Sequence, residues 1–208
     1  MSQTTMQPTP ATDVLPRTNP FVTRRTRPGA LPFLFPPGHS GPTCLATLRR
    51  HDWWGQIVGP HGSGKSTLLA TLTPLLAAAG RRVEFGLLHS DDRRLPFDVA
   101  AMAAWNGGTQ VVVDGFEQLA WWRRAWLIGQ CRRRGCGLLV TTHRPMRLPL
   151  LWRTRVDDAL AHRVVGELLA GQTAAIDRRD VGEMLRRCEG DMRETLFGLY
   201  DLVERRRS

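Results

Sequence analysis

The eight residues from Gly59 to Ser66, GPHGSGKS, constrain the fold of this chain more than any other stretch. They match the pattern GxxxxGK[ST] at every fixed position, follow the apolar run GQIVG and precede a stretch of helical character, 66–79. A glycine-rich turn between a strand and a helix lets successive backbone N–H groups face an anion, and the helix N-terminus adds its dipole. The stretch therefore predicts a phosphate-binding loop.

This loop holds the only lysine of the chain, although lysine and arginine together number 29. A compact ammonium fits inside a closed loop, whereas a planar guanidinium is too bulky. We expect Lys65 to reach the β and γ phosphates of a bound nucleotide and Ser66 to bind Mg²⁺ through its hydroxyl. The residues expected to line the nucleotide are Gly59, Pro60, His61, Gly62, Ser63, Gly64, Lys65, Ser66 and Thr67.

Strand-like and helix-like stretches alternate from about residue 43 onward. The expected strands are 55–59, 81–90, 110–114, 136–143 and 162–168, and the expected helices are 44–50, 66–79, 96–105, 116–134, 178–188 and 192–206. This alternation predicts an α/β fold, with a parallel sheet covered by helices on both faces and a short C-terminal helical lid. We expect a Pro-rich tail and strap over 1–42, the core over 43–170 and the lid over 171–208. The strap, 19–38, is too apolar for a free tail, and we expect it near the nucleotide.

Acidic residues at the ends of the expected strands are candidates for the metal site and for water activation. Asp114 ends the strand QVVVD about 50 residues after the loop, a position that suits binding of Mg²⁺ through water. Glu117, three positions further on, is the first candidate for orienting the attacking water, although it could instead complement a helix dipole. Asp91 and Asp92 are the reserve candidates.

The expected strand 136–143 ends in Thr141, Thr142 and His143. A polar side chain at the tip of a strand beside the phosphate loop can hydrogen-bond the γ-phosphate or the attacking water. Thr142 is the first candidate for this role and His143 the second. The alternative is that the hydroxyls only form hydrogen bonds with backbone groups at the end of the strand.

With these features in order, the chain resembles P-loop NTPases (Walker A proteins) of the additional-strand class. The segment CEGDMRETLFGLYDL, 188–202, is similar to the lid motif of AAA+ ATPases of the clamp-loader and replication-initiator branch. The resemblance implies an ATPase that uses Mg²⁺, with Arg193 at the second sensor position reaching toward the γ-phosphate. A pairing of Arg193 with a neighbouring carboxylate is the alternative. Unlike the family pattern, no glutamate directly follows Asp114, and the lid has room for about two helices only.

The resemblance also suggests partners. Arg153 and Arg155 lie where the family carries an arginine finger, which implies a nucleotide-dependent homo-oligomer.

The net charge of +10 fits nucleic acid or a solvated arginine-rich surface. The stretch WWRRAW, 121–126, could stack nucleobases or anchor a protein partner, although we expect core packing for at least two of its tryptophans. No apolar run reaches membrane-spanning length and no signal-peptide core follows the N-terminus, so we expect a cytoplasmic protein.

Three functions fit these residues: an ATPase that changes conformation, a nucleotide-dependent adaptor with little hydrolysis, and a small-molecule kinase with Asp92 as base. The missing contiguous glutamate favours the adaptor. The order of the strands separates the ATPase from the kinase. In the ATPase, the strand 136–143 lies between the strand before the loop and the strand that ends at Asp114. In the kinase, the strand before the loop and the Asp114 strand are direct neighbours.

Overall fold

The computed structural model describes residues 19–27, 29–89, 94–170 and 176–207. Its centre is one sheet of five parallel strands in the order β2-β3-β4-β1-β5. The strands are β1 (Trp54–Val58), β2 (Arg82–Leu87), β3 (Thr109–Asp114), β4 (Gly137–Thr142) and β5 (Leu150–Arg153). Strand β4 lies between β1 and β3, and because the strands are parallel, the C-terminal ends of all three lie at the same edge of the sheet.

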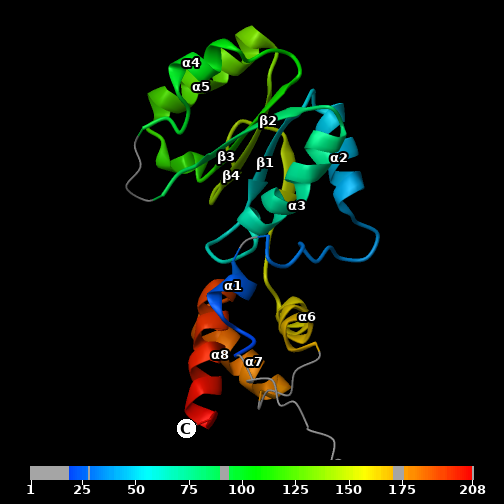
Figure 1. The fold of residues 1–208 in the computed structure, drawn as a ribbon, viewed down its shortest axis with the longest axis vertical. Helices are drawn as coiled ribbons and strands as arrows, with labels where there is room; N and C mark the ends of the chain where they lie inside the picture. The colour runs from blue at the N-terminus through cyan, green and yellow to red at the C-terminus, as the bar shows by residue number, and fades with distance from the viewer. Residues whose placement is uncertain (1–18, 28, 90–93, 171–175, 208) are drawn as a thin grey trace, which may run out of the picture.

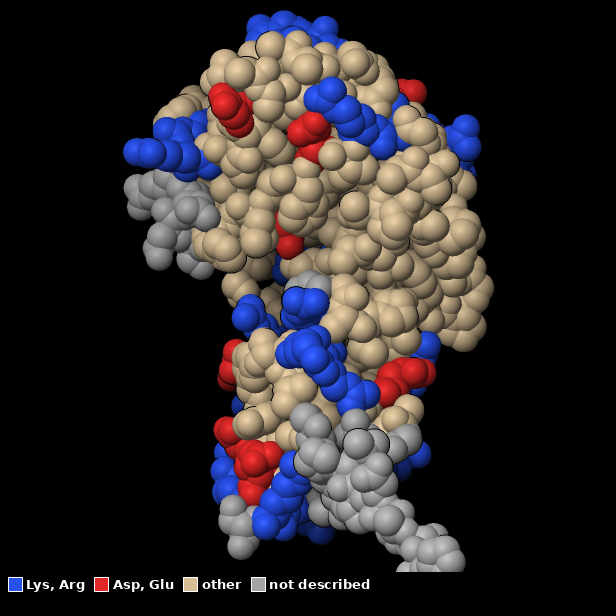
Figure 2. Space-filling model, viewed as in Figure 1, with Lys and Arg blue, Asp and Glu red and all other residues tan. Residues whose placement is uncertain are grey.

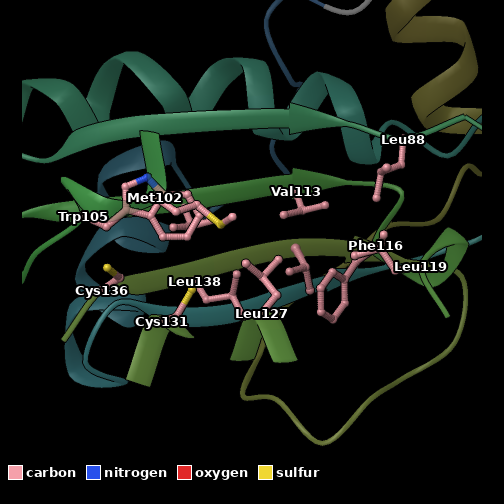
Figure 3. Close-up of a cluster of buried hydrophobic side chains, with 12 residues drawn as sticks. Leu88, Met102, Trp105, Val113, Phe116, Leu119, Leu127, Cys131, Cys136 and Leu138 are labelled. Atoms are coloured by element: carbon pink, nitrogen blue, oxygen red, sulfur yellow. The ribbon is translucent and has the colours of Figure 1, made fainter. Parts of the chain in front are cut away.

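Helices cover both faces of the sheet, and each face has its own apolar core (Figure 1). On one face lie α2 (Gly41–Arg50) and α3 (Lys65–Ala78), and on the other lie α4 (Val99–Ala103) and α5 (Trp121–Arg134). Figure 3 shows the second core, in which Leu127 and Cys131 of α5 pack against Val113 and Leu138 of the sheet. The α/β fold with helices on both faces is therefore confirmed.

The expected strand 162–168 is wrong, because these residues belong to helix α6 (Asp158–Leu169). The side chain of Asp157 caps this helix by accepting a hydrogen bond from the backbone N–H of Leu160. Ala161, Val165 and Leu168 are buried at helical spacing, so the apolar pattern has a period near 3.6 residues rather than 2. The fifth strand is instead β5, which lies earlier in the chain, where no strand was expected.

A helical unit, 158–207, follows the sheet (Figure 1). Helix α6, on the sheet side of the boundary expected at residue 170, packs against α7 (Arg178–Arg187) and α8 (Met192–Arg207) around one apolar core. Over the described residues, 158–170 and 176–207, three helices therefore form this unit, where the sequence suggested about two long ones. No helix in the described ranges is both long and apolar enough to cross a bilayer.

The N-terminal segment connects this helical unit to the phosphate loop. Phe21 is fully buried in the core of the helical unit, just before the short helix α1 (Thr23–Thr26). Further on, the backbone N–H of Phe33 donates to Oγ1 of Thr71 in α3, at 2.9 Å. The ring of Phe33 also packs beside Gly64. The segment thus passes directly over the loop.

Candidate nucleotide-binding site

The phosphate loop joins β1 to α3 and needs glycine for two separate reasons. Gly62 and Gly64 have φ of 60° and 89°, in the left-handed region where a side chain is strained. A Cβ atom at Gly59 would overlap the hydroxyl of Thr154, and one at Gly62 would overlap the carboxylate of Asp191. The loop therefore has the curled backbone that its glycines predicted, and it also packs closely against Thr154 and Asp191.

Lys65 lies inside this loop, with only 9% of its surface exposed. Its Nζ donates hydrogen bonds to the carbonyl oxygens of Gly59 at 2.8 Å and Pro60 at 2.7 Å. Burial lowers the pKa of the Lys65 ammonium, while the charges of Glu117, Asp114 and Asp191 act in the opposite direction. The ammonium of Lys65 therefore interacts electrostatically with carboxylates from three different segments.

Thr154, just after β5, supports the loop, and no sequence pattern marks this residue. Its hydroxyl lies 2.6 Å from the hydroxyl of Ser63, which in turn donates to the carbonyl of Pro60 at 2.7 Å. The backbone N–H of Thr154 donates to the carbonyl of Val58 at 2.8 Å. The edge strand therefore holds the loop from the side through side-chain and backbone contacts.

Asp114 and Thr141 meet at the ends of β3 and β4. Oγ1 of Thr141 donates to Oδ1 of Asp114 at 2.5 Å and accepts from the backbone N–H of Gly115 at 2.8 Å. Neighbouring residues of a strand point to opposite faces, so Thr142 cannot make the same contact. Oγ1 of Thr142 is buried and, among the described residues, has no hydrogen-bond partner.

Glu117 reaches the same edge from the 3₁₀ turn η1 (Phe116–Gln118). Its Oε1 lies 3.2 Å from Nδ1 of His143, and its Oε2 is buried with no hydrogen-bond partner among the described residues. The ring of His143 packs on that of His61, a loop residue, with the centroids 3.9 Å apart. Burial is the main cause that raises the pKa of Glu117. The structure thus brings together Glu117 and His143, two of the candidates from the sequence.

The helical unit approaches the loop through the turn before α8. The carboxylate of Asp191 accepts hydrogen bonds from the backbone N–H groups of Arg193 at 2.8 Å and Glu194 at 3.1 Å, and it packs against Gly62. An open cleft of about 480 Å³ runs between the two parts. Its lining residues are Pro60, His61, Arg187, Cys188, Glu189, Gly190, Asp191 and Glu194.

Arg193 itself points along α8. Its guanidinium lies 5.9 Å from the ring centroid of Phe197, and the ion pairs found in the described part of the chain do not involve it. The other arginine candidates, Arg153 and Arg155, are both exposed at the end of β5. Asp91 and Asp92 lie outside the described residues.

Helix α5 exposes all three tryptophans of WWRRAW, so the expectation that at least two pack in the core is wrong. Trp121, Trp122 and Trp126 are 73%, 52% and 40% exposed, because the buried face of the helix is formed by Leu127 and Cys131. Trp122, Trp126 and Leu95 also line a shallow groove of about 430 Å³. Figure 2 shows basic side chains gathered at the end of the molecule where α5 lies and again over the helical unit.

A five-stranded parallel sheet with the glycine-rich loop 59–66 between β1 and α3 defines an α/β fold of the P-loop type. Among solved structures, this fold is similar to that of a variant of RuvB from Thermotoga maritima, with a TM-score of 0.52 at 13% sequence identity. The match covers 74% of this chain and 57% of that one, so the chain spans just over half the length of RuvB. At this identity the likeness shows the fold alone. Neither a family model nor a curated protein matches the sequence.

Proposed function

We propose that this protein is an ATPase of the additional-strand, AAA+-like class, in which ATP hydrolysis moves the helical unit relative to the sheet. The observation that carries the proposal is the convergence of Lys65, Asp114 and Glu117 at one edge of the sheet, each from a different segment. The position of β4 between β1 and β3 supports an ATPase over a kinase. The kinase reading also needs Asp92, which lies outside the described residues.

The residues present fit a nucleotide with Mg²⁺. The glycine cradle and the first turn of α3 offer backbone N–H groups to the phosphates. Lys65 offers a cation whose hydrogen-bond partners, within the described residues, are the carbonyls of Gly59 and Pro60. Ser66 in that turn and Asp114, with its carboxylate oriented by Thr141, would hold the metal. The metal would neutralise charge that develops on the phosphate oxygens.

Glu117 is the proposed general base. Its pKa is raised by burial, which brings a carboxylate closer to the basicity that proton abstraction near neutral pH requires. With Oε1 directed at His143, Oε2, which has no hydrogen-bond partner in the described part of the chain, is the atom that would accept the proton of an attacking water. The hydroxyl of Thr142, also partnerless and at the neighbouring strand end, would hydrogen-bond that water or the γ-phosphate.

The contact of Asp191 with Gly62 supports coupling to the helical unit. A carboxylate against the phosphate loop repels incoming phosphates, so nucleotide binding would move the turn before α8 away from Gly62. The same movement would let Arg193 leave Phe197 and turn toward the γ-phosphate, the second sensor role that the resemblance implies. The helical unit would then report whether ATP is bound.

A cytoplasmic partner would receive this movement, and nucleic acid fits the charge and the exposed tryptophans of α5. The exposed Arg153 or Arg155 could complete the site of a second copy in a nucleotide-dependent homo-oligomer.

Steady-state phosphate release from ATP and Mg²⁺, with and without DNA, tests the proposal. We expect turnover that is stimulated by DNA and is lost in Lys65→Ala and Glu117→Gln. Tight ATP binding without turnover under any condition would favour the adaptor, which the separation of Asp114 from Glu117 also supports.

A further inference from the structure

Two elements bring Glu117 and His143 together. Gly115, with φ of 83°, turns the chain sharply after β3 and places Glu117 in the short turn η1. His143 directly follows β4, the neighbouring strand. Both side chains are mostly buried, with 20% of Glu117 and 29% of His143 exposed. Their contact is therefore fixed by the sheet rather than by a mobile surface loop.

The ring of His143 has one partner on each side. Nδ1 lies 3.2 Å from Oε1 of Glu117, and the ring packs on His61 at 3.9 Å between centroids, with 52° between the planes. A rotation of the ring would disturb both contacts. Because His61 belongs to the phosphate loop itself, the three residues form a continuous line from the loop to the carboxylate.

The lowered pKa of His143 favours a neutral imidazole at this contact. Burial, followed by the charges of Lys65 and His61, lowers the pKa of His143 to about 4. A neutral imidazole carries one N–H, and an ionised carboxylate can only accept. A hydrogen bond across the 3.2 Å contact would therefore be donated from Nδ1 to the ionised Glu117, which would leave Nε2 as an acceptor.

We propose that His143 is a positioning residue for Glu117, and that its packing on His61 makes the position of the Glu117 carboxylate depend on the conformation of the phosphate loop. This rests on the proposed function, in which Glu117 activates water. The contact engages Oε1 and leaves Oε2, which has no hydrogen-bond partner among the described residues, for the attacking water. Misplacing a catalytic group by about 1 Å can cost on the order of 100-fold in rate. A direct contact of His143 with the γ-phosphate is the competing role.

The chain allows the ring and the donor to be tested separately. His143→Phe keeps an aromatic ring against His61 and removes the donor, whereas His143→Asn removes the ring and keeps a donor near the position of Nδ1. His51→Phe, an exposed position after α2, is the matched control. We would measure kcat and KM for ATP in each variant and repeat His143→Phe in the Glu117→Gln background.

We expect His143→Phe to lower kcat by roughly 10- to 100-fold, with KM within about threefold of wild type. His143→Asn should recover most of the loss, and His51→Phe should behave as wild type. In the Glu117→Gln background, His143→Phe should cause little further loss, because the two residues act as one unit. An equal further loss in that background would overturn the positioning role in favour of direct contact. An unchanged kcat in His143→Phe would overturn it as well.

A second measurement does not depend on turnover. Nitrogen NMR of the imidazole rings reports which nitrogen carries the proton, and we expect Nδ1–H for His143 in the wild type and a change of tautomer in Glu117→Leu. The same tautomer in both proteins would overturn the hydrogen bond. If the wild-type protein binds ATP but never hydrolyses it, both the proposed function and the positioning role of His143 are contradicted. If His143→Phe hydrolyses ATP at the normal rate, only the positioning role is contradicted.

Discussion

The hydroxyl of Thr141 donates a 2.5 Å hydrogen bond to Oδ1 of Asp114 and accepts one from the backbone N–H of Gly115. Both strands end here, and the register places Thr141 beside Asp114. A fully buried hydroxyl thereby fixes the carboxylate and the turn that leads to Glu117. This contact connects the proposed metal site with the proposed base.

Thr141→Val should therefore weaken Mg²⁺-dependent ATP binding. It removes a hydrogen bond to a charged group, which typically contributes about 1.5–3 kcal/mol, or roughly tenfold or more in affinity. Calorimetric titration with ATP, with and without Mg²⁺, measures the effect. Thr141→Ser keeps the hydroxyl and should bind within about threefold of wild type. Equal ATP affinity in the Val and Ser variants would contradict the role given to this bond.

The brace at Thr154 predicts an effect on the loop rather than on the metal. Thr154→Val removes the hydroxyl 2.6 Å from Ser63 while keeping the shape of the side chain. We expect weaker ATP binding by about 1 kcal/mol, the usual contribution of a neutral hydrogen bond, and the loss should persist without Mg²⁺. Thr154→Ser should bind normally. If Thr154→Val weakened binding only when Mg²⁺ was present, the brace would have to act through the metal instead.

Glu117 should destabilise the folded protein at neutral pH. Burial raises its pKa above the unfolded value, so the folded state retains a proton that the unfolded state releases. The stability that this proton contributes is present at low pH and is lost as the pH rises through the unfolded and then the folded pKa. Glu117→Gln should raise Tm at pH 8, and the difference from wild type should shrink toward pH 4. A difference that is constant across this range would show that ionisation of Glu117 does not matter for stability.

The tryptophans of α5 predict salt-dependent binding of single-stranded nucleic acid. Stacking of a base on an aromatic side chain typically contributes about 1–3 kcal/mol, so replacing Trp121 and Trp122 by Ala should weaken binding at least fivefold. Fluorescence anisotropy of a labelled oligonucleotide, followed over a salt series, measures it. Phe85→Ala, which removes an exposed ring from β2, is the control. Unchanged affinity in the tryptophan variant, or no binding at low salt, would remove α5 as the nucleic-acid surface.

The sequence predicted the parts of the fold that local chemistry determines. The phosphate loop, four of the strands and the helices around them follow from glycine placement and apolar runs. The segment 162–168 was misread because adjacent valines favour a strand, whereas the Asp157 cap and burial every three to four residues make it a helix. Strand β5 lies next to a proline-rich break, and only its pairing with β1 defines it.

Contacts in the candidate site that depend on the pairing of strands could not be predicted from the sequence. Thr141 and Thr142 are adjacent, and only the pairing of β3 with β4 decides which of them meets Asp114. Thr154 carries no local pattern, because its role comes from a contact with Ser63 across 91 residues. Glu117 was a candidate from its spacing, but its contact with His143 depends on the turn at Gly115.

Single-turnover hydrolysis in Glu117→Gln tests most directly the claim that these residues form an ATP-hydrolysing site. Protein in excess over radiolabelled ATP and Mg²⁺ would be followed for both bound ATP and released phosphate, beside wild type and Lys65→Ala. We expect Glu117→Gln to hold ATP and release phosphate at least about 100-fold more slowly than wild type, as for the loss of a general base, and Lys65→Ala to hold little ATP. Wild-type release rates in Glu117→Gln, or full ATP binding by Lys65→Ala, would contradict the account.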